Sequence, residues 1–106
     1  GVQLRSGAQM KQRKLLFLYM AFYIYILYSP SSNQYYVGST EHVDARLERH
    51  NRGMVPSTKA YGPWELKHTE LFPSRAEAVI REKEIKSKKS RVYIEKLIRG
   101  TGGGIV

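Results

Sequence analysis

The sequence predicts a single small α/β domain in which helices flank a three-stranded antiparallel sheet, with the elements in the order β-β-α-β-α-α. The chain length of 106 residues accommodates one modest hydrophobic core. Three stretches rich in aromatic and β-branched residues predict strands, and three stretches with apolar residues at helical spacing predict helices. The sequence contains no internal repeat that would indicate a repetitive architecture.

The folded domain is expected to span residues 14–99. Residues 1–13 are expected to be a disordered leader or a remnant of upstream sequence, and the glycine-rich stretch 100–106 predicts a flexible tail. The basic residues Lys11 to Lys14 precede an apolar run from Leu15 to Tyr28, an order that resembles a secretory signal peptide. The run is shorter than the roughly 20 residues that a membrane-spanning helix needs, and no small-x-small cleavage pattern follows it. Its aromatic and β-branched residues therefore favour a buried strand.

Two neighbouring stretches, Phe22 to Tyr28 and Tyr35 to Thr40, predict a β-hairpin, because the residues from Pro30 to Asn33 between them favour a turn. Alternation along the first strand places its side chains on two opposite faces. One face carries Tyr23, Tyr25 and Leu27, and the other carries Phe22, Ile24, Ile26 and Tyr28.

A helix is predicted from Thr40 or Glu41 to about Asn51, with Gly53 ending it, because glycine tolerates the left-handed conformation in which helices often end. Residues spaced by three and four positions share one face of a helix. Here the shared face comprises Val43, Arg46, Leu47 and His50. An arginine on such a face either extends past the core to water or binds a phosphate, whose geometry its planar guanidinium matches.

The second half of the chain predicts one more strand and two more helices. Trp64 to Phe72 alternates loosely and predicts the third strand. Ser74 is expected to cap a helix from Arg75 to about Lys86, with Glu77 completing a capping box. A last helix is expected from about Ser90 onward, with an apolar face made of Val92, Ile94, Leu97 and Ile98.

The charge of the chain indicates a polyanionic partner. Eighteen Lys and Arg against nine Asp and Glu leave a formal net charge of +9, which favours nucleic acid or an anionic membrane surface. The absence of cysteine excludes disulfides, thiolate catalysis and Cys-ligated metal centres, and it is compatible with a reducing cytoplasm, where we expect the protein.

Candidate chemistry lies on the hairpin and on the helix that follows it. Tyr25 and Tyr36 offer hydroxyls, and Gly38 lets a ligand or another chain segment approach closely. Taken alone, these tyrosines also fit a role as packing residues of a small sheet. His50, one turn after Arg46, equally fits a hydrogen-bonded structural residue or a cation at a helix end.

Glu82 is the carboxylate of the helix from Arg75 whose neighbours at helical spacing are apolar: Ala78, Val79 and Ile85. It should therefore face inward, where an ionised carboxylate needs a cation or hydrogen-bond donors. The partner is either Lys86, one turn further on, or a divalent metal. A single carboxylate suffices for Mg²⁺, which keeps several waters and binds substrate phosphates.

This set of residues resembles the GIY-YIG endonuclease superfamily, in particular its short, stand-alone bacterial members. The resemblance follows the family's order through four motifs: Tyr23-Ile24-Tyr25, Tyr36-Val37-Gly38, Arg46 with His50-Asn51, and Glu82. Tyr23 stands where the family name has Gly, and Val37 stands where it has Ile. Both departures fall at positions that serve strand packing.

The resemblance implies metal-dependent hydrolysis of phosphodiester bonds in DNA. It implies a catalytic set of Tyr25, Tyr36, Arg46, His50 and Glu82, with Mg²⁺ or Mn²⁺ on Glu82. We expect DNA rather than a membrane as the partner, bound through phosphate contacts by the nearby basic residues Arg49, Arg52, Lys59, Lys83, Lys86, Lys88, Lys89 and Arg91. The alternatives are an inactive nucleic-acid-binding module of the same fold and a protein that binds membrane surfaces.

Overall fold

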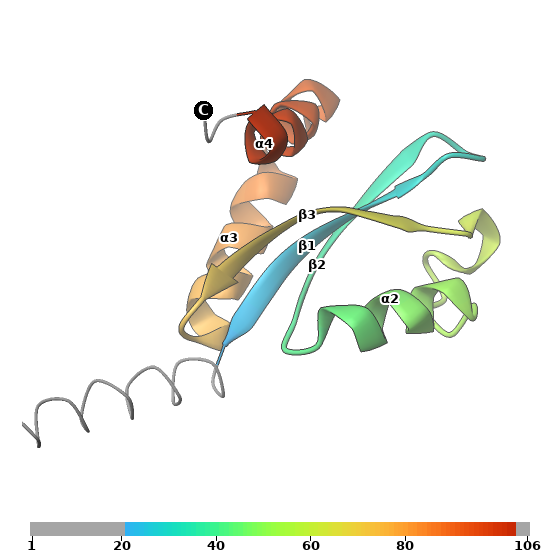
Figure 1. Cartoon of the computed structure of the whole chain (residues 1–106), viewed down its shortest axis with the longest axis horizontal. Coiled ribbons are helices and arrows are strands. Elements are labelled where there is room, and N and C mark those ends of the chain that lie inside the picture. The colour runs from blue at the N-terminus through green and yellow to red at the C-terminus, as the bar shows by residue number, and fades with distance from the viewer. Residues whose placement is uncertain (1–20, 104–106) are drawn as a thin grey trace, which may run out of the picture.

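A computed structural model describes residues 21–103, with side chains to residue 100, and it confirms the predicted fold class and element order (Figure 1). The elements are β1 (Phe22–Ser29), β2 (Gln34–Thr40), α2 (Val43–Asn51), the short 3-10 helix η1 (Lys59–Tyr61), β3 (Glu65–Phe72), α3 (Arg75–Ser87) and α4 (Arg91–Gly103). The predicted leader 1–13 and the apolar residues 15–20 lie outside the described residues. α4 extends into the stretch 100–106, for which the sequence predicts a flexible tail, and residues 104–106 are not described.

β1 is the central strand of an antiparallel sheet with the order β2-β1-β3, so β2 and β3 are its edges. The hairpin register pairs Tyr25 with Gly38 and Ile24 with Ser39. The register with β3 shifts between Ile26 and Leu27, which interrupts the loose alternation of the third strand. The site described below lies along the β2 edge.

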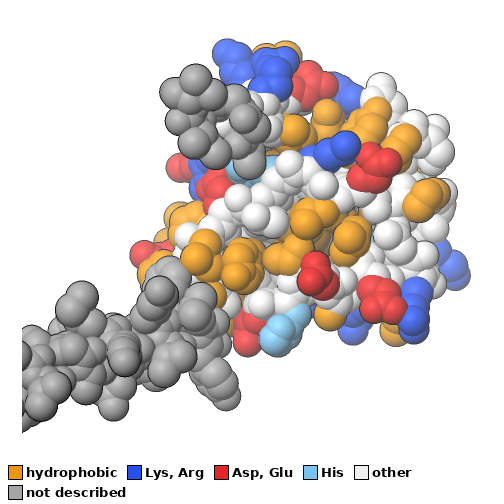
Figure 2. All heavy atoms as spheres, in the orientation of Figure 1, with side chains coloured by type: hydrophobic (Ala, Val, Ile, Leu, Met, Phe, Trp, Pro, Cys, Tyr) orange, Lys and Arg blue, Asp and Glu red, His pale blue; other side chains and the backbone are white. Residues whose placement is uncertain are grey.

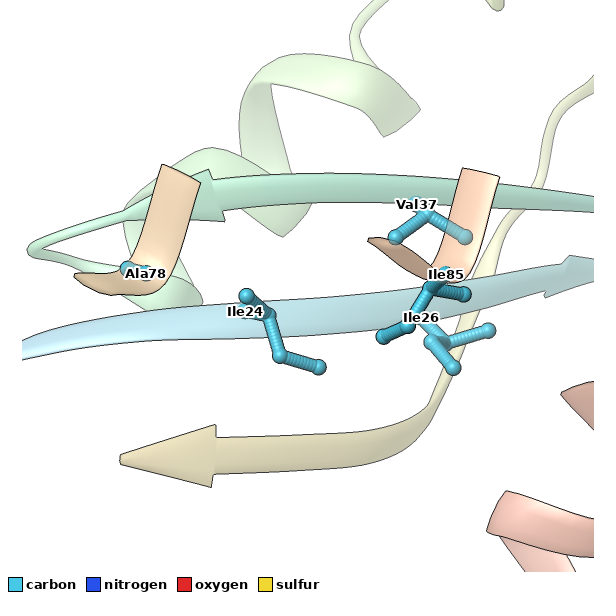
Figure 3. Packing of buried hydrophobic residues seen from close by; sticks show 5 residues of the cluster. All are labelled: Ile24, Ile26, Val37, Ala78 and Ile85. Carbon is cyan, nitrogen blue, oxygen red and sulfur yellow. The ribbon is translucent and has the colours of Figure 1, made fainter. Parts of the chain in front are cut away.

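The two faces of β1 contact different kinds of side chain, as its alternation predicts. On the side of α3 and α4, an aliphatic core consists of Ile24, Ile26, Val37, Ala78 and Ile85 (Figure 3). On the side of α2, a mainly aromatic cluster consists of Tyr25, Leu27 and Trp64, with Tyr36, Val43 and Leu47 packed against it. The aliphatic core therefore holds α3 on the sheet, and the aromatic cluster holds α2.

Two predictions about the helices are wrong in detail. α2 begins at Val43 and not at Thr40 or Glu41, because Thr40 is the last residue of β2 and its hydroxyl accepts the His42 N–H at 3.1 Å. Val92 does not face the core: it is 58% exposed, and Tyr93 packs against the core with Ile94 and others instead. α4 is therefore rotated relative to the predicted face.

The start of α3 and the end of α2 follow the predicted signals. The Ser74 hydroxyl accepts the Glu77 N–H at 3.3 Å, so Ser74 is the N-cap of α3. Gly53 adopts a φ of +73° just after α2, as expected for a glycine that ends a helix.

None of the helices within residues 21–103 is long and apolar enough to cross a membrane.

An ionic network links β3 to α3 and α4. Arg81 donates to both oxygens of Glu70, from Nε at 2.8 Å and from Nη2 at 3.2 Å. It also donates to Glu84 and to the Tyr93 hydroxyl. His68 lies 2.8 Å from Glu70 on the same strand. These hydrogen bonds lower the pKa of Glu70 although its burial opposes this, so its carboxylate stays ionised.

Candidate active site

The Tyr25 ring reaches from the central strand to the β2 edge because its cross-strand partner is a glycine. A Cβ at Gly38 would lie 2.6 Å from the Tyr25 hydroxyl oxygen and 2.7 Å from Cζ, closer than real Cβ contacts. Any other residue at this position would displace the ring. The absent side chain of Gly38 thus makes room for the hydroxyl of Tyr25, a residue that is only 1% exposed overall.

A chain of hydrogen bonds runs from the Tyr25 hydroxyl into the protein. The hydroxyl lies 3.0 Å from Nε2 of His50, which α2 places over the sheet. Nδ1 of His50 lies 2.8 Å from the Thr58 hydroxyl. His50 and Thr58 are both buried. Both ring nitrogens of His50 therefore have a fixed partner.

Tyr36, the second tyrosine of the predicted set, contacts the same imidazole from β2. Its ring centroid lies 4.7 Å from that of His50 and 6.2 Å from that of Tyr25. The Lys86 ammonium lies 6.0 Å from the Tyr36 ring centroid, on the side of α3. Tyr36 therefore lies between the aromatic cluster and Lys86 of α3.

Arg46 lies beside these rings and lines a small pocket. Burial raises the pKa of Tyr25 and lowers that of His50; the positive charge of Arg46 opposes the first shift and adds to the second. The pocket, of about 130 Å³, lies at the end of β2, and the residues that line it are Phe22, Ser39, Thr40, Glu41, His42, Arg46, Arg75 and Ala78. Two guanidinium groups and two hydroxyls line this pocket with one carboxylate, that of Glu41, which lies 3.4 Å from Arg75; the remaining positive charge suits an anion such as phosphate.

Glu82 faces β2 from α3, on the other side of the sheet from α2. Its side chain is 19% exposed, and its Oε1 accepts the Ser39 hydroxyl at 2.7 Å. Its Oε2 lies 2.6 Å from Nζ of Lys86, whose side chain is half exposed. The inward orientation predicted for Glu82 is correct, and Lys86 is its cationic partner in this structure. Through Ser39, the carboxylate contacts β2, the edge strand that carries Tyr36 and that the Tyr25 hydroxyl reaches.

The resting protonation states follow from burial and charge. Burial raises the pKa of Tyr25 well above its usual value, the neighbouring Tyr36 adds to this, and Arg46 opposes it. Burial also lowers the pKa of His50, with further contributions from Arg46 and Arg49. At neutral pH Tyr25 is therefore a neutral phenol, and His50 is a neutral imidazole.

Comparison with known proteins shows the family of this chain. Residues 21–96 match the GIY-YIG catalytic domain. The chain belongs to the GIY-YIG family. Its relatives include a UPF0213 protein of Natronomonas pharaonis, which is 39% identical over 82 residues that cover 76% of this chain and 94% of the relative. A UPF0213 protein of Staphylococcus haemolyticus is 41% identical over 66 residues, 61% of this chain and 79% of that protein.

A solved structure supports the fold of this GIY-YIG protein. The solution NMR structure of a UPF0213 protein from Bacillus halodurans has 38% sequence identity and a TM-score of 0.50, and the match covers 79% of this chain and 88% of that one. This chain and the Bacillus halodurans protein therefore share the small GIY-YIG fold.

The residues of this GIY-YIG domain could hold a metal through one carboxylate only. Within the described part of the chain, no group of three or more Asp, Glu or His side chains is close enough to form a metal site. Glu82 nevertheless fits a Mg²⁺ or Mn²⁺ ion that keeps most of its waters, because such ions bind through one or two carboxylates and substrate phosphates. Its carboxylate already pairs with a cation, the ammonium of the half-exposed Lys86, which ends a flexible side chain.

The structure places the predicted nucleic-acid-binding residues in different surroundings. Lys86 lies at the site itself. Arg49 lies close enough to His50 to lower its pKa, and Arg52 pairs with Glu48 at 2.5 Å. The remaining members are exposed residues of η1, α3 and the junction between α3 and α4: Lys59, Lys83, Lys88, Lys89 and Arg91. Of these, Lys88 lies over the Tyr93 ring and Arg91 over the Tyr35 ring.

A second pocket among the described residues, of about 580 Å³, is lined by none of the five predicted site residues. Its lining residues are Tyr23, Glu41, His42, Val43, Asp44, Ala45, Leu66 and Thr69. On the face shown in Figure 2, hydrophobic side chains gather in the middle, and Lys and Arg lie mainly toward the margins. We place the candidate active site at the smaller pocket, because that one is lined by Arg46 and Ser39.

Sequence reasoning missed three polar residues around the site. Ser39 binds Glu82, Thr58 binds His50, and Arg75 lines the pocket with Arg46. Ser39 could have been found from the strand pattern, since it follows Gly38 on the edge strand. Thr58 lies in a loop without periodicity, so no pattern in the sequence indicated it.

Proposed function

We propose that this protein is a metal-dependent DNA endonuclease whose active site comprises Tyr25, Tyr36, Arg46, His50 and Glu82. The observation that supports this best is the hydrogen bond between the Tyr25 hydroxyl and a buried, neutral His50, next to the positive charge of Arg46. A tyrosine that is a neutral phenol at rest can deprotonate water only if its own proton has somewhere to go. His50 Nε2 offers that place.

In the proposed reaction, a water molecule next to the Tyr25 hydroxyl attacks the phosphorus atom. The water passes a proton to the Tyr25 oxygen, and Tyr25 passes its own proton to Nε2 of His50. The bond between phosphorus and one ester oxygen breaks, and the leaving alkoxide takes a proton from solvent. His50 ends the step as an imidazolium and returns its proton to solvent, so no proton is gained or lost overall.

Arg46 supports this step by charge. Its guanidinium would bind a phosphate oxygen in the pocket at the end of β2 and stabilise the charge that develops in the transition state. A bound phosphate would also offset the effect of Arg46 on His50, whose pKa would rise as it accepts the proton. Tyr36 would hold water or phosphate beside the same imidazole.

Glu82 is the proposed holder of the metal. A divalent cation such as Mg²⁺ or Mn²⁺ would supply Lewis-acid stabilisation at the leaving oxygen when bound there. Ser39 orients the carboxylate by donating to Oε1, which leaves Oε2 as the oxygen available after Lys86 moves away.

DNA would be held mainly by phosphate contacts, because the chain carries a net charge of +9. We expect the affinity for DNA to fall about tenfold or more between 50 and 200 mM salt. Titration of labelled duplex DNA in EDTA at several salt concentrations measures this. Binding that does not change with salt would argue against a phosphate-based interface.

The decisive experiment is a cleavage assay with labelled single-stranded, duplex, flapped and branched DNA in Mg²⁺, Mn²⁺ or EDTA. We expect cleavage of at least one of these substrates with metal and none in EDTA. Arg46→Ala should abolish it, while Arg99→Ala, which removes one exposed positive charge from α4, serves as the control and should leave cleavage unchanged. Salt-dependent binding without cleavage of any substrate would favour the alternative, an inactive nucleic-acid-binding module of this fold.

A further inference from the structure

Thr58 lies behind the candidate active site, and its hydroxyl, N–H and carbonyl groups all form hydrogen bonds. It is 1% exposed, and its hydroxyl oxygen lies 2.8 Å from Nδ1 of His50. The hydroxyl donates to the Val55 carbonyl at 3.3 Å, and the Thr58 N–H donates to the same carbonyl at 3.1 Å. The Thr58 carbonyl accepts the indole N–H of Trp64 at 3.1 Å. These hydrogen bonds fix the position of both the backbone and the side chain of Thr58.

The loop that carries Thr58 is fastened to α2 at its far end. The Asn51 side chain accepts the Trp64 N–H at 2.6 Å and donates to the Trp64 carbonyl at 3.1 Å. Trp64 itself is buried in the aromatic cluster with Tyr25. Asn51 directly precedes the loop of residues 52–64, and its side chain binds the last residue of that loop. These hydrogen bonds hold the loop in place and keep the Thr58 hydroxyl against His50.

We infer that Thr58 is a positioning residue that fixes the tautomer of His50, with the proton on Nδ1 and the lone pair on Nε2. The Val55 carbonyl, 3.3 Å from the Thr58 hydroxyl, gives that hydroxyl an acceptor other than His50, and its oxygen can then accept the Nδ1–H of His50 at 2.8 Å. Nε2 then accepts the hydroxyl hydrogen of Tyr25. A neutral imidazole has one donor and one acceptor nitrogen, so fixing one nitrogen fixes the other.

The opposite tautomer would prevent the proton transfer described above. A hydrogen on Nε2 would point at the Tyr25 oxygen, and the Tyr25 proton would have no acceptor on His50. This catalytic consequence rests on the proposed function, whereas the tautomer itself can be measured without any cleavage. Thr58 acts through His50 and does not touch the reacting atoms.

The test is NMR of protein labelled with ¹⁵N-histidine, in which long-range ¹H–¹⁵N correlations distinguish the two tautomers. His50→Gln identifies the His50 signals. We expect Nδ1–H in the wild type, a shift of the population toward Nε2–H in Thr58→Val, and a return to Nδ1–H in Thr58→Ser, which keeps the hydroxyl. The exposed neighbour Ser57→Ala is the matched control and should leave the His50 signals unchanged.

Cleavage should follow the tautomer. We expect Thr58→Val to lower kcat by about tenfold to a hundredfold, the range observed when a group that orients a metal-bound histidine is lost, and Thr58→Ser to restore most of it. An Nε2–H tautomer in the wild type, or an unchanged tautomer in folded Thr58→Val, would overturn the inference. If Thr58→Val does not fold, Thr58→Ala removes the same hydroxyl and takes its place in the test. An Nδ1–H tautomer in a protein that cuts no DNA would refute the proposed function and leave this inference standing.

Discussion

Two carboxylates, Glu70 and Glu82, bind cations of α3 in different ways. Glu70 receives two hydrogen bonds from the Arg81 guanidinium and a third from His68. Glu82 receives one from the flexible Lys86 ammonium and one from the Ser39 hydroxyl. Both carboxylates are about equally buried, with 25% and 19% of the side chain exposed. The geometry and flexibility of the partner, and not burial, distinguish them.

The difference indicates two separate roles. A planar guanidinium that binds both oxygens of a carboxylate forms a fixed link between elements, here β3 and α3. A lysine one helical turn away forms a weak, exchangeable pair, so the carboxylate can accept another cation. Glu70 should therefore serve stability, and Glu82 should serve the proposed activity.

The largest expected effect is on cleavage by Glu82→Gln. We expect a loss of at least about a hundredfold in kcat, because the amide keeps the bond with Ser39 but binds a divalent cation poorly. DNA binding in EDTA and the melting temperature should stay close to wild type, since the basic residues supply the binding energy. Glu48→Gln removes the same charge from exposed α2 and should cut at the wild-type rate. A Glu82→Gln protein with full activity would refute the metal assignment.

The second effect is on stability. Arg81→Met should lower the free energy of unfolding by about 2 to 3 kcal/mol, because it leaves the carboxylate of Glu70 without its main partner in a partly buried position. Urea denaturation measures it. A change of less than about 0.5 kcal/mol, the size of a surface pair, would mean that the two carboxylates are not as different as their geometry indicates.

The pH dependence of the free energy of unfolding tests the structural role of Glu70. The pKa of Glu70 is lower in the folded protein than its ordinary value of 4.5. Its contribution to stability is therefore fully present above pH 4.5 and is lost as the pH falls through the lower, folded-state value. The difference in unfolding free energy between wild type and Arg81→Met should shrink over that acid range. A difference that stays constant down to pH 3 would show that Glu70 does not carry it.

The smallest effect should come from Lys86→Met. An ion pair between residues four positions apart on a helix contributes about 0.2 to 0.5 kcal/mol, so the free energy of unfolding should change by no more than this. Urea denaturation of Lys86→Met and Arg81→Met under the same conditions compares the two cations of α3 directly. A loss as large as that of Arg81→Met would make Glu82 a structural carboxylate as well.

The sequence predicted much of the fold because its periodic elements carry strong local signals. Strand alternation correctly separated the two faces of β1, and the serine and glycine signals located the ends of α3 and α2. The start of α2 was missed because β2 extends to Thr40, and strand pairing is a long-range interaction. The exposure of Val92 was missed because the rotation of α4 depends on its contacts with other elements.

The candidate site was predictable to the extent that its residues lie on periodic elements. Helical spacing grouped Arg46 with His50 and oriented Glu82 inward. Its supporting residues were not predictable, because Ser39 meets Glu82 across 43 positions of sequence and Thr58 reaches His50 from an irregular loop. Local pattern determines which side chains face inward, and only the folded chain determines which of them meet.

The glycine at position 38 has a consequence for mutational tolerance. Tyr25 belongs to the middle strand, where a side chain is normally shielded by strands on both sides, and its hydroxyl comes to the outer edge only across the bare backbone of Gly38. Even alanine there would collide with the phenol, so saturation mutagenesis should find no acceptable replacement. A position with no side chain of its own would then be among the least replaceable in the domain.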